Sequence, residues 1–145
     1  MAHSLPLILV FVLLAAALWT ALRVRPAMMW KAYHEAGGRA FREGRYDEAD
    51  FLLGMARRVA EGISRLDLRT AVSARDLARL REAEGRLAES EVQYLDALAI
   101  LELRLGMEHS EVGLLLDAYA ALLKRLGRDI EADAAHARAR TIRGS

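Results

Sequence analysis

Gly44-Arg45-Tyr46-Asp47-Glu48-Ala49 is one of three stretches that share a pattern and decide the fold of this chain. The other two are Gly85-Arg86-Leu87-Ala88-Glu89-Ser90 and Gly127-Arg128-Asp129-Ile130-Glu131-Ala132. Their glycines lie 41 and 42 residues apart. A period of this length is typical of stacked repeats, in which each helical pair buries its apolar face against the next. The sequence therefore predicts an all-α fold containing an α-solenoid of three helix-turn-helix repeats.

Six stretches with apolar residues at helical spacing indicate where the helices of these repeats lie. We expect the first helices of the pairs over residues 27–43, 67–84 and 110–126, and their partners over residues 46–62, 87–105 and 129–143. Small residues inside the pairs allow antiparallel helices to approach closely: Ala49, Ala56, Ala97, Ala132 and Ala139.

The boundaries of the helices carry their own signals. A residue in left-handed geometry lets the chain turn after a helix, and glycine adopts it most readily. Glycines stand at four such positions, Gly44, Gly85, Gly106 and Gly127. Asp67 can cap the third helix, and Ser110 can cap or begin the fifth. Pro26 biases Arg25 away from helical geometry, which predicts a joint or kink before the first pair.

Over residues 30–143 the chain resembles the tetratricopeptide repeat family. The matching positions in the three repeats are Tyr33, Ala36, Gly37, Ala40, Ala49, Leu53 and Ala56; then Ala74, Leu77, Ala78, Arg81, Ser90, Tyr94 and Ala97; then Leu116, Tyr119, Ala120, Leu123, Ala132, His136 and Ala139. Arg81 and His136 replace aromatics, and Ser90 replaces an alanine. The long period and the segment Leu105–Val112 are similar to the kinesin light chain subtype. This resemblance implies a protein-binding solenoid with its first helices on the hollow face.

The amino-terminal end has a different composition from the repeats. Residues 1–22 contain no Asp, Glu, Lys or Arg, and Leu5 to Leu22 is almost entirely apolar. As a helix this run covers about 27 Å, close to the roughly 30 Å of a hydrocarbon core. A cleaved secretory signal is the alternative, but the run is longer than a usual signal core and no positive segment precedes it. We therefore expect a retained transmembrane anchor over residues 1–25 and a repeat domain over residues 26–145.

Charge next to this run predicts which side of the membrane holds the domain. Arg23, Arg25, Lys31, Arg39, Arg42 and Arg45 follow the run, opposed there only by Glu35 and Glu43. Loops rich in Lys and Arg stay in the cytoplasm. The layout also resembles bacterial inner-membrane proteins that carry tetratricopeptide repeats. We expect a single-pass protein of the inner (plasma) membrane with a cytoplasmic repeat domain.

Charge and residue types argue against several kinds of function. The chain carries 21 Lys and Arg against 20 Asp and Glu without a long block of one sign, so we expect no nucleic-acid binding. It has no cysteine, and its four histidines (His3, His34, His109 and His136) show no metal-ligand spacing. Glu82 and Glu84 would point about 200° apart on a helix and could not serve one substrate. We expect no enzymatic activity, no cofactor and no bound metal.

The polar residues of the first helices define a candidate partner-binding groove. Projecting the repeats onto a curved array places ten side chains there: His34, Phe41, Arg42, Arg75, Asp76, Arg79, Glu82, Asp117, Lys124 and Arg125. Such a groove is mixed in charge and slightly basic. It suits an extended or helical segment that bears carboxylates, because arginines form paired contacts with them.

Two functions follow from an anchor joined to a solenoid. The first is a membrane-bound adaptor or assembly factor whose groove binds a membrane-associated partner protein, with Leu5 to Leu22 in the bilayer. The second is a permanent accessory subunit of a larger membrane complex, for which Ala17 and Ala21 would permit close helix packing. Self-association is also open, because the last helix is alanine-rich.

Overall fold

The computed structural model describes residues 4–144, and in residues 4–6 and 23 only the backbone. His3 and the start of the predicted anchor therefore lie outside the described residues, as do the side chains of Leu5 and Arg23. The described part is built from six helices: α1 (Ser4–Arg42), α2 (Tyr46–Ile63), α3 (Leu68–Ala83), α4 (Leu87–Leu105), α5 (Ser110–Arg125) and α6 (Asp129–Gly144). The described residues form no strand.

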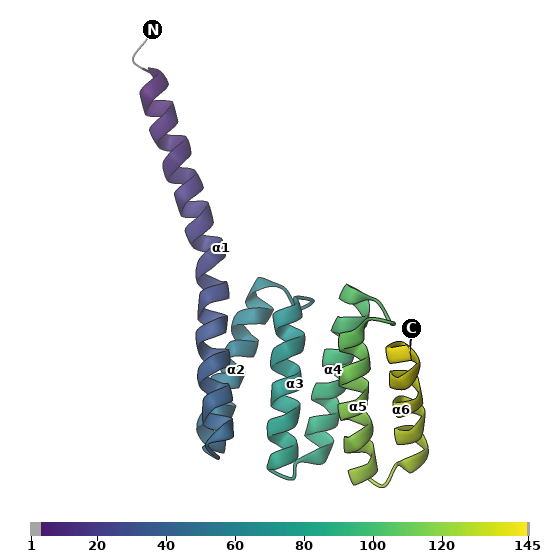
Figure 1. The fold of residues 1–145 in the computed structure, drawn as a ribbon. Helices are drawn as coiled ribbons and strands as arrows, with labels where there is room; N and C mark the ends of the chain where they lie inside the picture. The colour runs from purple at the N-terminus through teal and green to yellow at the C-terminus, as the bar shows by residue number, and fades with distance from the viewer. Residues whose placement is uncertain (1–3, 145) are drawn as a thin grey trace.

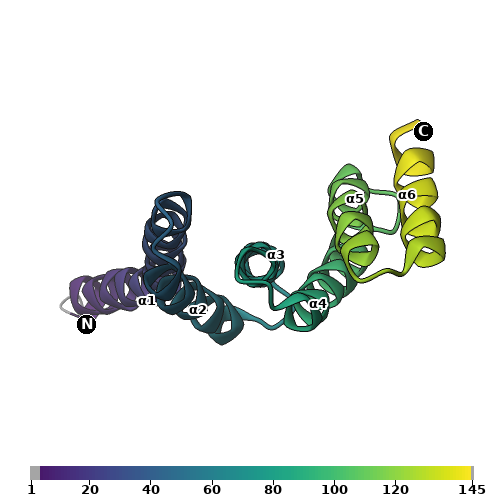
Figure 2. The ribbon, with the colours of Figure 1, turned by 90° about the horizontal axis from the view of Figure 1, so that it is seen from below.

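The helices form three antiparallel hairpins stacked side by side (Figure 1). α1 pairs with α2, α3 with α4, and α5 with α6, and each hairpin also packs on the next through α2 with α3 and α4 with α5. Figure 2, seen from below, shows the hairpins along an arc with α1, α3 and α5 on its inner side. The predicted helical-repeat fold is thus present, and its helix bounds agree with the expected ranges to within a few residues from α2 onward.

The repeated Gly-Arg turn closes each hairpin in the same way. Gly44, Gly85 and Gly127 have φ values of 74°, 78° and 74°. The amide that follows each glycine donates to a carbonyl five residues earlier, as in the bond of 2.9 Å from Arg45 N to Ala40 O. The shared sequence pattern therefore corresponds to one repeated structural element.

Small residues on the facing sides of the helices allow the hairpins to pack closely. Ala49, Ala56, Ala97, Ala132 and Ala139 are completely buried. At Gly37 an added Cβ would lie 2.8 Å from the Leu53 side chain, so α1 and α2 touch there directly. Ser90 occupies an alanine position and satisfies its hydroxyl by donating to Ala78 O at 2.9 Å.

The two links between hairpins start the next helix with a side-chain cap. The Asp67 carboxylate accepts from Arg69 N at 2.8 Å, as predicted. In the second link His109 is the cap, since its Nδ1 accepts from Glu111 N at 3.2 Å, and Ser110 begins α5.

α1 departs from the expected break at Pro26. We expected the first repeat helix to begin near residue 27, yet α1 runs without interruption from Ser4 to Arg42, with Pro26 inside it. Figure 1 shows the helix changing direction near the point where it reaches the other helices. A proline inside a helix removes one backbone hydrogen bond and bends the helix without having to end it. The division into an anchor and a repeat domain remains a prediction.

Candidate docking face

The inner side of the arc is formed by α1, α3 and α5, and we call it the inner face (Figure 2). It presents two hollows along its length. The first lies between α1 and α3 and has a volume of about 410 Å³. The second, of about 290 Å³, lies further along the arc and reaches α5.

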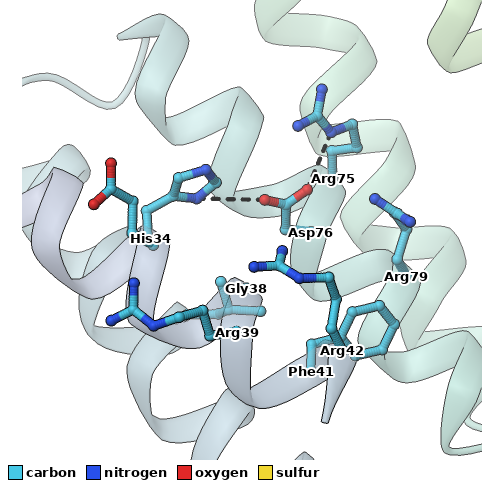
Figure 3. A pocket seen from close by; sticks show the side chains of 10 residues that line it. His34, Gly38, Arg39, Phe41, Arg42, Arg75, Asp76 and Arg79 are labelled. Atoms are coloured by element: carbon cyan, nitrogen blue, oxygen red, sulfur yellow. Dashed lines mark hydrogen bonds and ion pairs between the residues drawn. The ribbon is translucent and has the colours of Figure 1, made fainter. Parts of the chain in front are cut away.

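Six of the ten predicted groove residues line the first hollow: His34, Phe41, Arg42, Arg75, Asp76 and Arg79. The residues labelled in Figure 3 come from α1, between His34 and Arg42, and from α3, between Arg75 and Arg79. The sequence projection missed Glu35, Arg39 and Leu53, which also line the hollow. Glu35 and Arg39 lie one turn apart at the edge of the α1 face, and Leu53 reaches in from α2 opposite Gly37.

Aromatic packing holds His34, which lines this hollow, in place. The rings of Trp30 and His34 stack with centroids 4.8 Å apart. Trp30 Nε1 donates to the buried Ser73 Oγ at 3.0 Å, which joins α1 to α3. Trp30 therefore packs within the repeat domain, while Trp19 on the same helix is 57% exposed.

The charge in the first hollow is predominantly positive. Asp76 is already engaged, with Oδ2 lying 3.3 Å from His34 Nδ1 and Oδ1 accepting from Arg75 Nε at 3.1 Å. Arg39, Arg42 and Arg79 make no ion pair with any residue that the structure describes. The Arg79 guanidinium lies 5.9 Å from the centre of the Phe41 ring. An anionic group entering the hollow would meet three arginines that make no ion pair with a carboxylate that the structure describes.

The second hollow is lined by Phe41, Arg79, Glu82, Tyr94, Ala118 and Ala121. Glu82 links three helices there, because it accepts from Tyr94 Oη at 2.7 Å and from Arg125 Nη1 at 3.0 Å. Burial and its hydrogen bond to Glu82 hold the pKa of Tyr94 above its ordinary value. Glu82 and Arg125 thus satisfy each other and close the inner face between α3 and α5.

The third repeat contributes less to the inner face than the sequence predicted. Asp117 Oδ1 lies 2.7 Å from His136 Nδ1, and Asp117 Oδ2 lies 2.7 Å from Arg143 Nη1. Lys124 Nζ lies 3.7 Å from Asp133 Oδ1. These partners all belong to α6. Asp117 and Lys124 therefore tie α5 to α6, and neither lines either hollow.

No part of the described chain gathers three or more metal-binding side chains. Glu82 and Glu84 have separate partners, since Glu84 accepts from Arg81 Nη1 at 2.9 Å. That the protein is not an enzyme stays a prediction.

The amino-terminal half of α1 is the second candidate functional element. Beginning at Leu7, α1 is long and apolar enough to cross a membrane, with a best window whose mean hydropathy is 2.4 and of which none is buried. Its large apolar side chains are exposed, as in Phe11 at 74% and Leu22 at 64%. Length and composition alone support this assignment.

The three stacked hairpins and their arc define the protein as a helical repeat protein of the α-solenoid type. One solved structure with this fold is BtubC (BKLC) from P. vanneervenii, a kinesin light chain-like helical repeat protein, with a TM-score of 0.78 and 22% identity over 82% of this chain. The chain spans 47% of the length of that protein. No family model and no curated protein sequence matches the chain. At this identity the likeness shows the fold alone.

Proposed function

We propose that this protein is a membrane-anchored scaffold that binds an acidic segment of a partner protein along its inner face. The observation that carries the proposal is the joining, in one helix, of an exposed apolar half to a half that lines a cationic hollow. The fold supports protein binding, because arrays of helical hairpins offer extended concave surfaces for partners. The partner segment supplies carboxylates to Arg39, Arg42 and Arg79.

Affinity purification of the full chain after gentle detergent extraction tests this proposal. We expect a stoichiometric partner to be recovered with the wild-type protein and lost with the double variant Arg42→Glu and Arg79→Glu. Arg58→Glu is the matched control, because Arg58 is an exposed arginine of α2, away from both inner-face hollows. Recovery of the wild-type chain alone, or equal loss in the control, contradicts the proposal.

The accessory-subunit alternative makes a different prediction about stability. An adaptor domain folds by itself, whereas an obligate subunit is unstable without its complex. Residues 27–145 expressed alone should therefore melt cooperatively if the protein is an adaptor. Aggregation of this fragment would favour the permanent subunit.

The proposed topology places the repeat domain in the cytoplasm, because positive charge follows the apolar run. Fusions of the carboxyl end to a reporter active only in the cytoplasm and to one active only in the periplasm test this. Activity of the periplasmic fusion alone overturns the assigned side.

A further inference from the structure

The solenoid has two edges, and they differ in chemistry. The edge toward which the amino-terminal half of α1 projects carries the links over residues 64–67 and 106–109, and we call it the anchor edge (Figure 1). The opposite edge carries the turns at Gly44, Gly85 and Gly127, and we call it the far edge. The following argument rests on the proposed function, since it takes α1 to cross a bilayer.

Two separate contacts fix the level of the first link along α1. Gly37 faces Leu53 in an antiparallel pair, so Ile63, ten residues further along α2, lies level with Ala27. Trp30 bonds to Ser73 in a parallel pair, so Leu68, five residues before Ser73, lies level with Arg25. Both contacts therefore place the link beside residues 25–27 of α1.

This level is within the head-group layer if the anchor spans the membrane. Residues 25–27 follow Leu22, the last residue of the apolar run, by three to five positions, or about 5 to 8 Å of helix. The interfacial layer on each side of a bilayer is about 5 to 8 Å thick. The first link therefore reaches the depth of the lipid head groups, and the second link lies on the same edge.

The anchor edge presents the side chains that suit this depth. Each link exposes one large apolar residue, Leu66 at 45% and Met107 at 62%. Arg65 and Arg104 are exposed beside them and make no ion pair with a described residue. On the first link the carboxylate of Asp67 is engaged by the α3 backbone, since it accepts from Arg69 N. The second link carries one carboxylate, that of Glu108.

The far edge shows that this chemistry is not a general property of the turns. Each of its turns places an arginine after the glycine, and each arginine pairs with a nearby glutamate, such as Arg86 with Glu84 at 3.3 Å. The corresponding pairs in the other turns are Arg45 with Glu43 and Arg128 with Glu131. The far edge also exposes Ile130, at 88%, so apolar exposure alone does not distinguish the two edges.

We propose that the anchor edge is a second membrane-contact surface, specific for anionic lipids. Leu66 and Met107 enter the interfacial layer, and Arg65 and Arg104 bind lipid phosphates. The repeat domain then lies against the bilayer along its whole anchor edge instead of standing away from it on α1.

Site-specific fluorescence tests the proposal on the full chain, which has no cysteine of its own. Single-cysteine variants Leu66→Cys, Met107→Cys and Ile130→Cys are labelled with an environment-sensitive dye and reconstituted in phosphatidylcholine vesicles with phosphatidylglycerol. We expect blue-shifted emission at positions 66 and 107, and loss of it to a head-group-attached quencher. Position 130 is the matched control and should stay unquenched.

A fourth label, at Leu14→Cys, separates the inference from the proposed function. Quenching at position 14 by an acyl-chain quencher shows that the anchor is inserted. With position 14 quenched, unquenched labels at 66 and 107 overturn the inference alone. An unquenched label at position 14 overturns the membrane anchor, and the inference with it.

The arginines are tested by composition and by charge reversal. Vesicles without phosphatidylglycerol, and the double variant Arg65→Glu with Arg104→Glu, should both reduce quenching at position 107. Circular dichroism checks that the double variant keeps its helix content. Equal quenching in all three samples overturns the specificity for anionic lipids.

Discussion

The two halves of α1 are built on one uninterrupted helix yet meet different surroundings. From Leu7 to Leu22 its large apolar side chains are exposed, whereas from Ala27 to Arg42 it packs on α2 and α3. The apolar half is formed mainly by leucine, valine and alanine, and the packed half contains Gly37 and Ala40 where other helices approach. Gly37 and Ala40 thus mark where the packed half of α1 meets its neighbours, and the apolar half has no such neighbour among the helices that the structure describes.

Gly37→Leu should have the largest effect on stability, and it acts on the packed half of α1. The added side chain collides with Leu53, so we expect the domain to lose about 3 kcal/mol of unfolding free energy. Ala17→Leu in the exposed half is the control and should leave the melting curve unchanged. Thermal unfolding followed by circular dichroism in detergent measures both. An unchanged Gly37→Leu curve would mean that α1 and α2 are not in contact there.

Trp30→Phe tests the polar contact of the packed half. The substitution leaves the buried Ser73 hydroxyl without its donor and should cost about 1 to 2 kcal/mol. Adding Ser73→Ala removes the orphaned group and should recover part of the loss. Additive losses in the double variant, measured by denaturant unfolding, would show that the two side chains do not interact.

Alkaline pH should lower the stability of the repeat domain and leave the apolar half of α1 unaffected. Burial and a hydrogen bond to Glu91 raise the pKa of Tyr119 to about 12, from about 10 in an unfolded chain. The stabilisation is complete below pH 10 and is lost as pH rises through 12; for this partly exposed group it amounts to less than about 1 kcal/mol.

Melting between pH 8 and 11.5 measures this loss, and Tyr119→Phe should reduce the dependence without removing it, because the raised pKa of Tyr94 acts in the same direction. Membrane retention should not change over the same range, because residues 7–22 carry no ionisable side chain. Release of the full chain by an alkaline wash would contradict a spanning helix.

Pro26→Ala should have the smallest effect on stability, within about 0.5 kcal/mol, since Pro26 lies where packing on the domain ends. It restores one backbone donor and should straighten α1. Electron-spin distance measurements between labels at Ala16→Cys and Arg58→Cys would report the change in angle. The same distance with and without Pro26 would assign the bend to another cause.

The sequence was sufficient to predict the fold because its repeat signals are local. The Gly-Arg turns and the buried alanines each act through backbone geometry within one hairpin. The rule for residues before proline did not reveal that α1 continues through Pro26, because it describes one residue's preference while a helix is held by bonds on both sides.

The residues of the inner face were predicted less completely than the fold, because helical spacing does not show which neighbouring helix a side chain contacts. Helical spacing correctly grouped His34 with Arg42 on α1, and Arg75 with Arg79 on α3, and all four line the first hollow. It could not show that Asp117 and Lys124 bend toward α6, since a spacing argument contains no information about partners on the neighbouring helix.

Because α1 is one continuous helix, the direction in which the inner face opens is fixed relative to the apolar half of that helix. A helix turns by about 100° for each residue. Inserting one residue between Leu22 and Ala27 would therefore rotate the arc by about 100° about the axis of α1, relative to the apolar half of that helix. If α1 spans the membrane as proposed, the apolar half therefore sets the side toward which the inner face opens, and a membrane-bound partner would have to approach from that side.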